Sequence, residues 1–352
     1  MNLSDGFFWI VLLVLTTGTV CATPIYDIYD LGTIGGPWSK AWEINNQGEI
    51  VGAAYTDEGV EHATLWETGL PPVDLGTLGG STSRAHAIND NGTIVGYSDT
   101  GGGAHHAFLL QDALMTDLGT LGGSSSVAWD INFKGNVVGW AHTDSGFYNA
   151  TLWVDGIANN LGTAGGDYSI AYGINSWDVV VGVAETGTGS DMAVMWQDGQ
   201  INELGTLPGG SWSTARAIND NGEIILWADT AGGDNHACLW VENIIADIGT
   251  FGGSDSWAYD LNNNGHVVGW AEAIDGTYQA FLYDGFQMHN LGTLGGLFSA
   301  AYGINDIGEI VGLAQTSSGQ MHAVLWTQIP EPITVILLSL GILPVVRRRY
   351  RV

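Results

Sequence analysis

Positive charge is what this sequence most lacks. Its 352 residues include only eight Lys and Arg against 37 Asp and Glu, for a formal net charge of −29 at pH 7. So acidic a chain has no electrostatic footprint for nucleic acid, which we exclude as a direct partner. Half of the basic residues lie in the last six positions, so that residues 23–328 keep four against 35 acids: Lys40, Arg84, Lys134 and Arg216. This charge argues against binding to anionic lipid and fits solubility in salty surroundings or weak cation binding.

Cysteine is almost absent as well. The two residues are Cys21 and Cys238, and cleavage after Ala22 would leave Cys238 alone. A disulfide framework is thereby excluded, and we expect Cys238 to be a small core residue. Nothing between residues 23 and 328 has the pattern of a long amphipathic helix.

Familiar catalytic and metal-binding signatures are missing too. The chain has no sialidase-type Ser-x-Asp-x-Gly-x-Thr-Trp box, no His-Glu-x-x-His, no Gly-x-Ser-x-Gly and no Cys-x-x-Cys. The Asp-Asn-Gly segments at 90–92 and 220–222 look superficially like calcium loops but lack the alternating acids and the closing Glu. We expect hairpin turns there, with calcium as the weaker alternative. We therefore predict no catalytic residue, no metal site and no cofactor, and leave open whether the protein is an enzyme.

A repeat of 43 or 44 residues is what the sequence does contain. Its core reads Leu-Gly-Thr, then Gly-Gly, then Ser-x-Ala, then Ile-Asn. A fixed period of this length marks a repeat architecture. The first residue of the seven copies falls at Leu31, Leu75, Leu118, Leu161, Leu204, Ile248 and Leu291.

Each repeat has four short apolar runs, which alternation and β-branched content predict to be strands. The segment Asn46-Gln47-Gly48 lies between the first two runs, and its residue types favour a hairpin turn. A four-stranded unit of about 43 residues is typical of one propeller blade, whereas the competing parallel β-helix has much shorter coils. In the first repeat the predicted strands are Ala41–Asn45, Glu49–Ala53, His62–Trp66 and Val73–Leu78.

The two ends of the repeat array complement one another. Tyr26–Leu31 resembles a fourth strand with no blade before it, and His322–Trp326 is a third strand with no fourth strand after it. Their pairing would close a ring and remove an open sheet edge. We predict an all-β, seven-bladed β-propeller of four-stranded blades over residues 26–328, closed by the N-terminal strand.

One position of the first strand attracts attention as a candidate ligand site. It follows the repeated Ala, close to the expected axis, and holds Trp42, His86, Trp129, Tyr172, Arg216, Tyr259 and Tyr302. Aromatic faces stack well on apolar ring surfaces, so sugar stacking is one interpretation. Packing between blades is the other, because position 42 alternates in phase with Ile44. The candidates for stacking are Trp42, Trp129, Tyr172, Tyr259 and Tyr302.

Two further repeated positions carry expectations. The histidines His62, His106, His236 and His322 occupy equivalent places on different blades, too far apart to share a metal, and we expect capping or interblade hydrogen bonds. The second strand has Gly in six repeats but Leu226 in the fifth. Because Gly in a strand often marks close backbone approach, we expect local widening, or smaller neighbours in the adjoining blade, around Leu226.

The N-terminal segment, residues 1–22, is predicted to be a signal peptide. Phe7–Leu15 is an apolar run too short for a stable span, and Val20-Cys21-Ala22 offers a cleavage site. The segment departs from the usual pattern because no Lys or Arg precedes the apolar run.

The C-terminal segment, residues 330–352, combines Pro330-Glu331-Pro332, the apolar run Ile333–Val346 and Arg347-Arg348-Arg349. It resembles the PEP-CTERM sorting signal of Gram-negative bacteria. The resemblance implies an exosortase-type sorting enzyme as a partner, a short transmembrane segment before processing, and delivery to the envelope surface or the extracellular matrix. A plain, permanent C-terminal membrane anchor is the alternative.

The repeat resembles the HAF family of extracellular repeat proteins through His106-Ala107-Phe108 and variants at His62, His236 and His322. The resemblance covers Tyr26 to Trp326. It implies an extracellular location and a repeat architecture, but no activity. We expect an exported, non-catalytic surface or matrix protein that binds exopolysaccharide or another surface partner. The alternatives are a glycan-active hydrolase or lyase, or a purely structural, permanently anchored protein. Two or three carboxylates with a His or Arg at one channel mouth would favour the enzyme.

Overall fold

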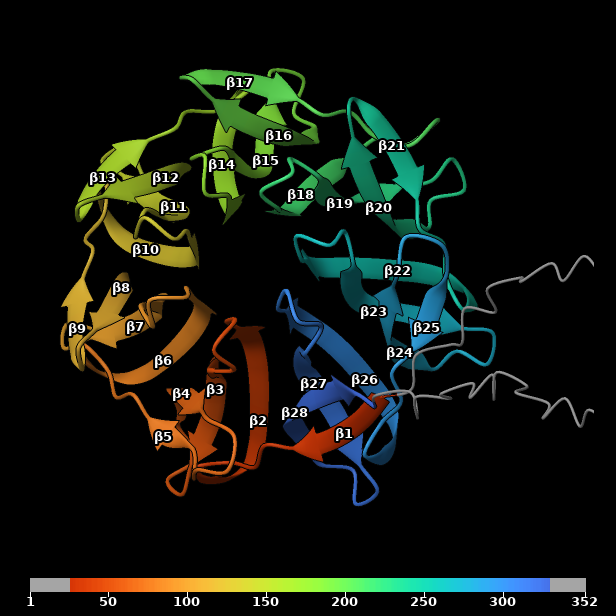
Figure 1. The fold of residues 1–352 in the computed structure, drawn as a ribbon. Coiled ribbons are helices and arrows are strands. Elements are labelled where there is room, and N and C mark those ends of the chain that lie inside the picture. The colour runs from red at the N-terminus through yellow and green to blue at the C-terminus, as the bar shows by residue number, and fades with distance from the viewer. Residues whose placement is uncertain (1–25, 330–352) are drawn as a thin grey trace, which may run out of the picture.

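The computed structural model describes residues 26–329 as β-sheets arranged in a ring around a central axis, with no helix among them (Figure 1). The predicted signal peptide, Pro330, Glu331, Pro332 and the Arg cluster 347–349 lie outside the described residues. Within residues 26–329, no helix has the length and apolar character needed to cross a membrane. The predictions of an all-β fold and of a β-propeller built from four-stranded blades are confirmed.

Four kinds of strand recur in each repeat. The strands nearest the axis are β2 (Gly35–Ile44), β6 (Gly79–Ile88), β10 (Gly122–Ile131), β14 (Gly165–Ile174), β18 (Ser213–Ile218), β22 (Gly252–Leu261) and β26 (Gly295–Ile304). The second strands are β3 (Ile50–Thr56), β7 (Ile94–Thr100), β11 (Val137–Thr143), β15 (Val180–Thr186), β19 (Ile224–Asp229), β23 (Val267–Ala273) and β27 (Ile310–Thr316).

The remaining two kinds complete each sheet toward the rim. The third strands are β4 (Glu61–Trp66), β8 (His105–Gln111), β12 (Tyr148–Val154), β16 (Asp191–Gln197), β20 (Asn235–Val241), β24 (Tyr278–Tyr283) and β28 (Met321–Gln328). The outermost are β5 (Val73–Asp74), β9 (Leu114–Asp117), β13 (Ile157–Asn160), β17 (Gln200–Glu203), β21 (Ile244–Asp247), β25 (Met288–Asn290) and β1 (Tyr26–Asp30).

The strands form five separate four-stranded sheets and one sheet of eight strands. The eight-stranded sheet contains β22–β25 together with β26–β28 and β1, and a single parallel pair, Tyr278 with Phe298, joins its two halves. The number of separate four-stranded blades is therefore five where we predicted seven. The physical reason is that β24 and β26 approach closely enough at this one pair to merge two units.

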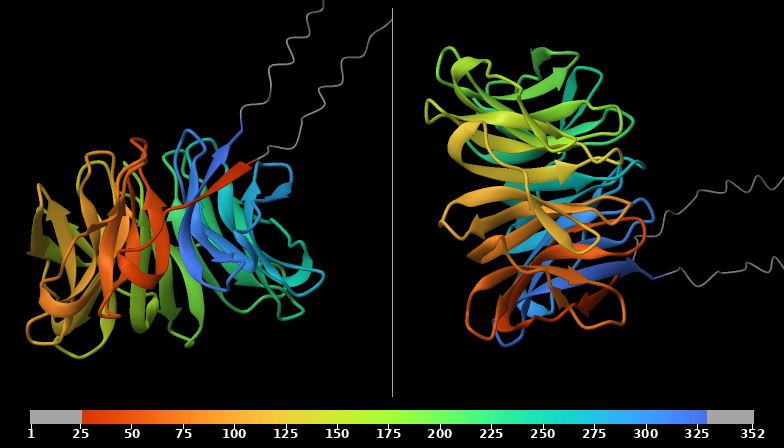
Figure 2. Two further views of the ribbon diagram at one scale, coloured as in Figure 1. Left: turned by 90° about the horizontal axis from the view of Figure 1, so that it is seen from below. Right: turned by 90° about the vertical axis from the view of Figure 1, so that its left-hand side faces the viewer.

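The N-terminal strand pairs with the last strand, as predicted. β1 lies antiparallel to β28, from Tyr26 opposite Gln328 to Asp30 opposite Val324. The side views show the two strands next to each other at one place in the ring (Figure 2). Ile28 packs against the core cluster that includes Trp326. The first and last strands of the ring thus form one sheet.

The innermost strands begin earlier than predicted. β2 starts at Gly35, not at Ala41, so the Gly-Gly pair that precedes the predicted strand belongs to it. Gly35 has φ +119°, and a side chain at Gly36 would collide with Tyr55 and Thr56 of the neighbouring strand. These glycines allow β2 to approach β3 closely.

A β-bulge interrupts every innermost strand at the same place. In β2 the pairing passes from Ala41–Gly52 to Glu43–Val51 and skips Trp42. Gly52, opposite the bulge, allows the backbone of β2 to approach β3 of the same sheet closely. A side chain at Gly52 would collide with the carbonyl of Lys40. The close approach is therefore within a blade and not between blades, contrary to our expectation.

The fifth repeat departs from this pattern. Leu226 keeps the register by pairing with Ala215, but β18 begins at Ser213, because Pro208 adds a residue and Gly209-Gly210 form a turn instead of a strand. Leu226 is fully buried in a core cluster with Ala215 and Cys238. The local widening or smaller neighbours expected around Leu226 remain a prediction.

Candidate functional site: the central channel

The bulges place the seven candidate positions around one cavity in the channel. A bulge re-aims the side chain of the extra residue, and here it does so in every repeat. The cavity has a volume of about 100 Å³ and is lined by all seven: Trp42, His86, Trp129, Tyr172, Arg216, Tyr259 and Tyr302. The sequence therefore predicted correctly which residues converge near the axis.

These side chains also contact one another. The rings of His86 and Trp129 stack with centroids 4.1 Å apart, Trp42 and Tyr302 lie 4.9 Å apart, and Tyr259 and Tyr302 lie 4.7 Å apart. His86 Nδ1 donates to the carbonyl of Ala128 on the next innermost strand, and burial lowers its pKa to about 3. Much of the aromatic surface is thus used in packing around the ring.

Basic side chains gather at the same level. The guanidinium carbon of Arg216 lies 3.9 Å from the ring centre of Tyr172 and 4.6 Å from that of Trp227. Lys40 Nζ lies 3.4 Å from the ring centre of Trp42. Burial, followed by the charge of Arg84, lowers the pKa of Lys40 to about 6. Of the four basic residues within residues 26–329, Arg216 lines the channel, Lys40 lies on the ring of Trp42, and Arg84 belongs to the neighbouring innermost strand, β6.

Three carboxylates follow the bulge residues and line the channel beyond them. Asp130 accepts hydrogen bonds from the backbone N–H of Ile131 at 2.7 Å and of Ile174, on the next innermost strand, at 2.8 Å. Asp260 does the same with Leu261 and Ile304, both at 2.8 Å. These two carboxylates therefore join neighbouring sheets. The third, Glu43, accepts only from Ile44 through Oε1 among the described residues.

The environment of these carboxyls favours their neutral form. Burial raises the pKa of Asp130 to about 6 and that of Asp260 to about 7, although their hydrogen bonds act in the opposite direction. Burial and then the nearby charge of Asp260 raise the pKa of Glu43 well above its usual value. Burial is the common cause, because the channel wall removes much of the water that would solvate a carboxylate.

A ring of asparagines surrounds the channel mouth next to the carboxylates. Each side-chain amide donates to the backbone carbonyl of the next asparagine, at 3.0–3.2 Å, and the ring closes from Asn305 to Asn45. The mouth holds a cavity of about 220 Å³. The members are Asn45, Asn89, Asn132, Asn175, Asn219, Asn262 and Asn305. We did not predict this ring, although its signal was visible as the Asn that ends Ile-Asn or Leu-Asn in every repeat.

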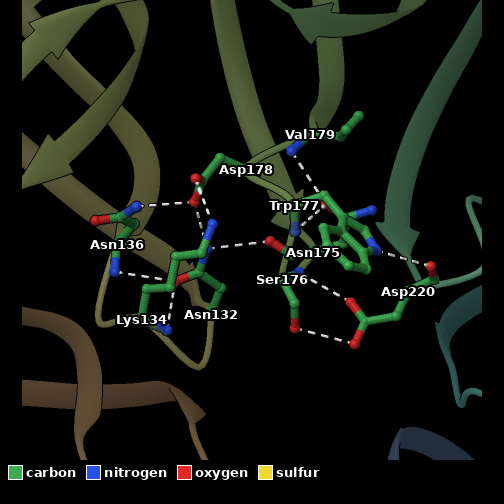
Figure 3. Close-up of polar contacts among 9 residues, drawn as sticks. All are labelled: Asn132, Lys134, Asn136, Asn175, Ser176, Trp177, Asp178, Val179 and Asp220. Atoms are coloured by element: carbon green, nitrogen blue, oxygen red, sulfur yellow. Dashed lines mark hydrogen bonds and ion pairs between the residues drawn. The ribbon is translucent and has the colours of Figure 1, made fainter.

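One turn at this mouth uses an aspartate where the others have glycine (Figure 3). Asp178 has φ +64°, which costs backbone strain for a side-chain-bearing residue. Its Oδ1 accepts from Asn132 Nδ2 and Asn136 Nδ2, both at 2.8 Å, and its Oδ2 lies 2.7 Å from Lys134 Nζ. Asp178 thereby joins its turn to the preceding sheet. It also pairs with Lys134, the one Lys or Arg within residues 26–329 that lies apart from Lys40, Arg84 and Arg216.

The repeated histidines are structural, with different partners than expected. His62 Nδ1 lies 2.7 Å from Asp74 Oδ2 on the outermost strand of the same sheet, and His106 and His236 make equivalent contacts. The Asp also accepts the backbone N–H of a glycine, as Asp74 does from Gly76 at 2.8 Å. The bond lies within a blade and joins its third and fourth strands. The part of the chain that the structure describes contains no cluster of three or more His, Cys, Asp or Glu suited to a metal ion.

Half-exposed aromatic residues lie toward the opposite end of the innermost strands, where those strands begin. Trp140, Tyr148 and Tyr168 form one chain of ring contacts at 5.6 and 5.1 Å. Trp257, Trp270 and Tyr278 form another at 5.9 and 5.0 Å. The position after the bulge glycine supplies Trp140 and Trp270, a pattern that our sequence analysis did not single out.

No protein-family model matches the chain, and no curated protein matches its sequence. Among solved structures it is similar to a puromycin hydrolase mutant complexed with PGG, at 11% identity with a TM-score of 0.58, over 86% of this chain and 55% of that one. It is also similar to a Mycobacterium tuberculosis puromycin-hydrolyzing peptidase, at 12% identity with a TM-score of 0.57, over the same shares. The chain thus spans about half the length of these structures, and at this identity the similarity shows the propeller fold alone.

Proposed function

We propose that this protein is an exported cell-surface or extracellular-matrix repeat protein that binds exopolysaccharide or another surface partner without catalysis. The observation that carries the proposal is the pair of half-exposed aromatic chains on the second and third strands of two units, which include Trp140, Trp270 and Tyr278. Indole and phenol rings offer flat apolar faces with a polar edge, which suits sugar rings that are apolar on one face and polar at the rim.

We also propose that the eight-stranded sheet counts as two blades, which makes a seven-bladed ring. Its halves are each a four-stranded antiparallel unit, and one residue pair joins them. The asparagine ring supports this count, because it has one member per repeat and passes through both halves. Asn262 donates to the carbonyl of Asn305 at 3.0 Å, and Asn305 donates to that of Asn45 at 3.2 Å.

The binding experiment uses immobilised polysaccharides. The full-length chain should be retained by an exopolysaccharide from biofilm matrix and release no soluble fragments. Trp270→Ala should weaken retention several-fold, because it removes a ring in contact with both Trp257 and Tyr278. Phe286→Ala is the matched control, since Phe286 is 92% exposed on the loop before β25 and contributes to neither aromatic chain. Equal retention of both variants and the parent chain would contradict sugar binding at this surface.

A glycan-active hydrolase or lyase is the second candidate. Glu43, Asp130, Asp260, His86 and Arg216 line one cavity, which is the combination of groups we expected to favour an enzyme. Carboxyls with raised pKa values are candidates for acid catalysis. Against this, both oxygens of Asp130 and of Asp260 already accept backbone hydrogen bonds. Glu43 is left as the candidate acid, and fragment release that disappears in Glu43→Gln would favour the enzyme.

The route to the surface is part of the proposal. The leader at residues 1–22, the Pro330-Glu331-Pro332 motif and the Arg cluster support export followed by processing by an exosortase-type enzyme. A permanently anchored structural protein remains the alternative product of the same segments.

A further inference from the structure

The few basic residues of this acidic protein are concentrated at the channel. Within residues 26–329 only Lys134 lies elsewhere, and it pairs with Asp178. Arg216 lines the cavity, and Lys40 Nζ lies 3.4 and 3.6 Å from the ring centres of Trp42 and Tyr302, which also line it. The charges of Arg84 and Arg216 disfavour the charged form of Lys40, whereas the charge of Glu61 favours it. Gathering like charges in a partly buried place is unfavourable unless something of opposite charge offsets it.

The channel carboxylates do not serve as that counter-charge. Asp130 and Asp260 direct both carboxyl oxygens at backbone N–H groups, and among the described residues neither forms an ion pair with these cations. Among the described residues, Arg84 alone of the three cations makes an ion pair, from its Nη2 to Glu61 Oε2 at 2.6 Å.

The same region has buried donors without acceptors, and one buried acceptor without a donor, Glu61 Oε1 beside Arg84. Arg216 Nε, Arg84 Nε, Trp42 Nε1 and Trp129 Nε1 are all inaccessible and have no hydrogen-bond partner among the described residues. Unpaired buried donors are costly, and several in one place indicate a ligand that brings acceptors. Arg216, Trp42 and Trp129 line the same cavity of about 100 Å³. A water takes up roughly 30 Å³ in the liquid, so the cavity has room for a small polar group.

We propose that this cavity binds a carboxylate, with Arg216 as the main contact and Arg84 supplying further positive potential. The inference rests on the proposed glycan-binding function and names its ligand class: the carboxylate of a hexuronic acid residue at the end of an acidic polysaccharide. The sugar ring would lie outside the cavity, against the half-exposed aromatic rings. A guanidinium fixed on the face of Tyr172 keeps its N–H edge available for an oxyanion.

The test is calorimetry on the full-length chain with three probes: a trisaccharide of saturated hexuronate residues, a neutral trisaccharide of the same length, and acetate as the small free acid. We expect the acidic trisaccharide to bind and the neutral one to bind at least tenfold more weakly. Arg216→Gln should weaken acid binding about tenfold or more, because it removes a charge-assisted contact. Lys134→Gln is the matched control: it removes the same charge away from the cavity and should change the affinity less than twofold.

The other outcomes are decisive as well. Acetate binding as tightly as the trisaccharide, with the same loss in Arg216→Gln, would keep the carboxylate site but assign it to a small free acid and remove support for the polysaccharide. Equal binding of neutral and acidic trisaccharides, unaffected by Arg216→Gln, would overturn the carboxylate site and leave glycan binding standing. Binding of no probe would overturn both.

Two further variants test the proposal if Arg216→Gln does not fold. Arg216→Lys keeps the charge and should retain part of the affinity. Arg84→Gln changes a side chain that is 39% exposed and should weaken acid binding several-fold through the lost potential. Acid binding that is insensitive to both variants would overturn the proposal.

Discussion

His322 Nδ1 lies 2.7 Å from Asp30 Oδ2, although the two residues are 292 positions apart in the sequence. His62 with Asp74, His106 with Asp117 and His236 with Asp247 show the same contact at the same distance inside one repeat. Asp30 thus occupies the place of a fourth-strand aspartate in the sheet of β28. The N-terminal strand reproduces the side-chain chemistry of the strand it replaces, as well as its backbone pairing.

Removing the N-terminal strand should destabilise the ring strongly. Deletion through Thr33 strips β28 of its partner and uncovers the core beneath Ile28, so we expect a loss of about 3 kcal/mol or more in the free energy of unfolding, measured with urea. The substitutions Asp30→Ala and Asp74→Ala should each cost only about 1 kcal/mol, and equally, because both aspartates are about two-fifths exposed. A deletion no costlier than Asp30→Ala would show that the strand does not close the ring.

The asparagine ring should be a major source of stability. Asn219 Nδ2 donates to Asn262 O at 3.1 Å, and its Oδ1 accepts the N–H groups of Asn221 and Glu223. Asn219→Ala leaves these buried and part-buried groups unpaired and should cost about 3 kcal/mol in chemical denaturation. Asn221→Ala, two residues along in the same turn but exposed, should cost less than about 1 kcal/mol. Similar costs for the two variants would mean that the ring contributes little.

The contribution of Asp260 to stability should fall as the pH rises from about 4 to about 7. Burial raises the pKa of Asp260 in the folded protein to about 7, so in this window the folded state binds more protons than the unfolded state. Asp260→Asn should flatten the slope of the unfolding free energy against pH by roughly 2 kcal/mol over the window. The control Asp198→Asn removes a carboxylate from an exposed turn and should leave the slope unchanged. A slope that is the same in both variants would show that Asp260 ionises normally.

The surface form should be shortened at both ends. We predict a product that begins near Thr23 and ends near Pro332, because the Arg cluster holds the C-terminal segment at the cytoplasmic side until it is processed. Mass spectrometry of protein recovered from the cell surface measures both ends. An intact Arg351-Val352 terminus on that protein would indicate a permanent anchor instead.

The repeat period and its turn residues were sufficient to predict an all-β propeller and the pairing of the first strand with the last. The reason is that both depend on local patterns: alternation sets the strands, and the unmatched strand types at the two ends leave one way to complete a sheet. The position of Trp42 and its six counterparts near the axis was also predictable, because strand order within a blade sets the distance from the centre.

Only the tertiary structure decided what those positions do. The bulge that turns Trp42 into the channel, the approach of Gly52 to Lys40 and the merging of two units at Tyr278 and Phe298 all arise from contacts between strands. The asparagine ring and the gathering of Arg216 with Lys40 and Arg84 join residues dozens to hundreds of positions apart. No local pattern encodes such distances, so the sequence determined the architecture, and the closed ring determined which side chains meet.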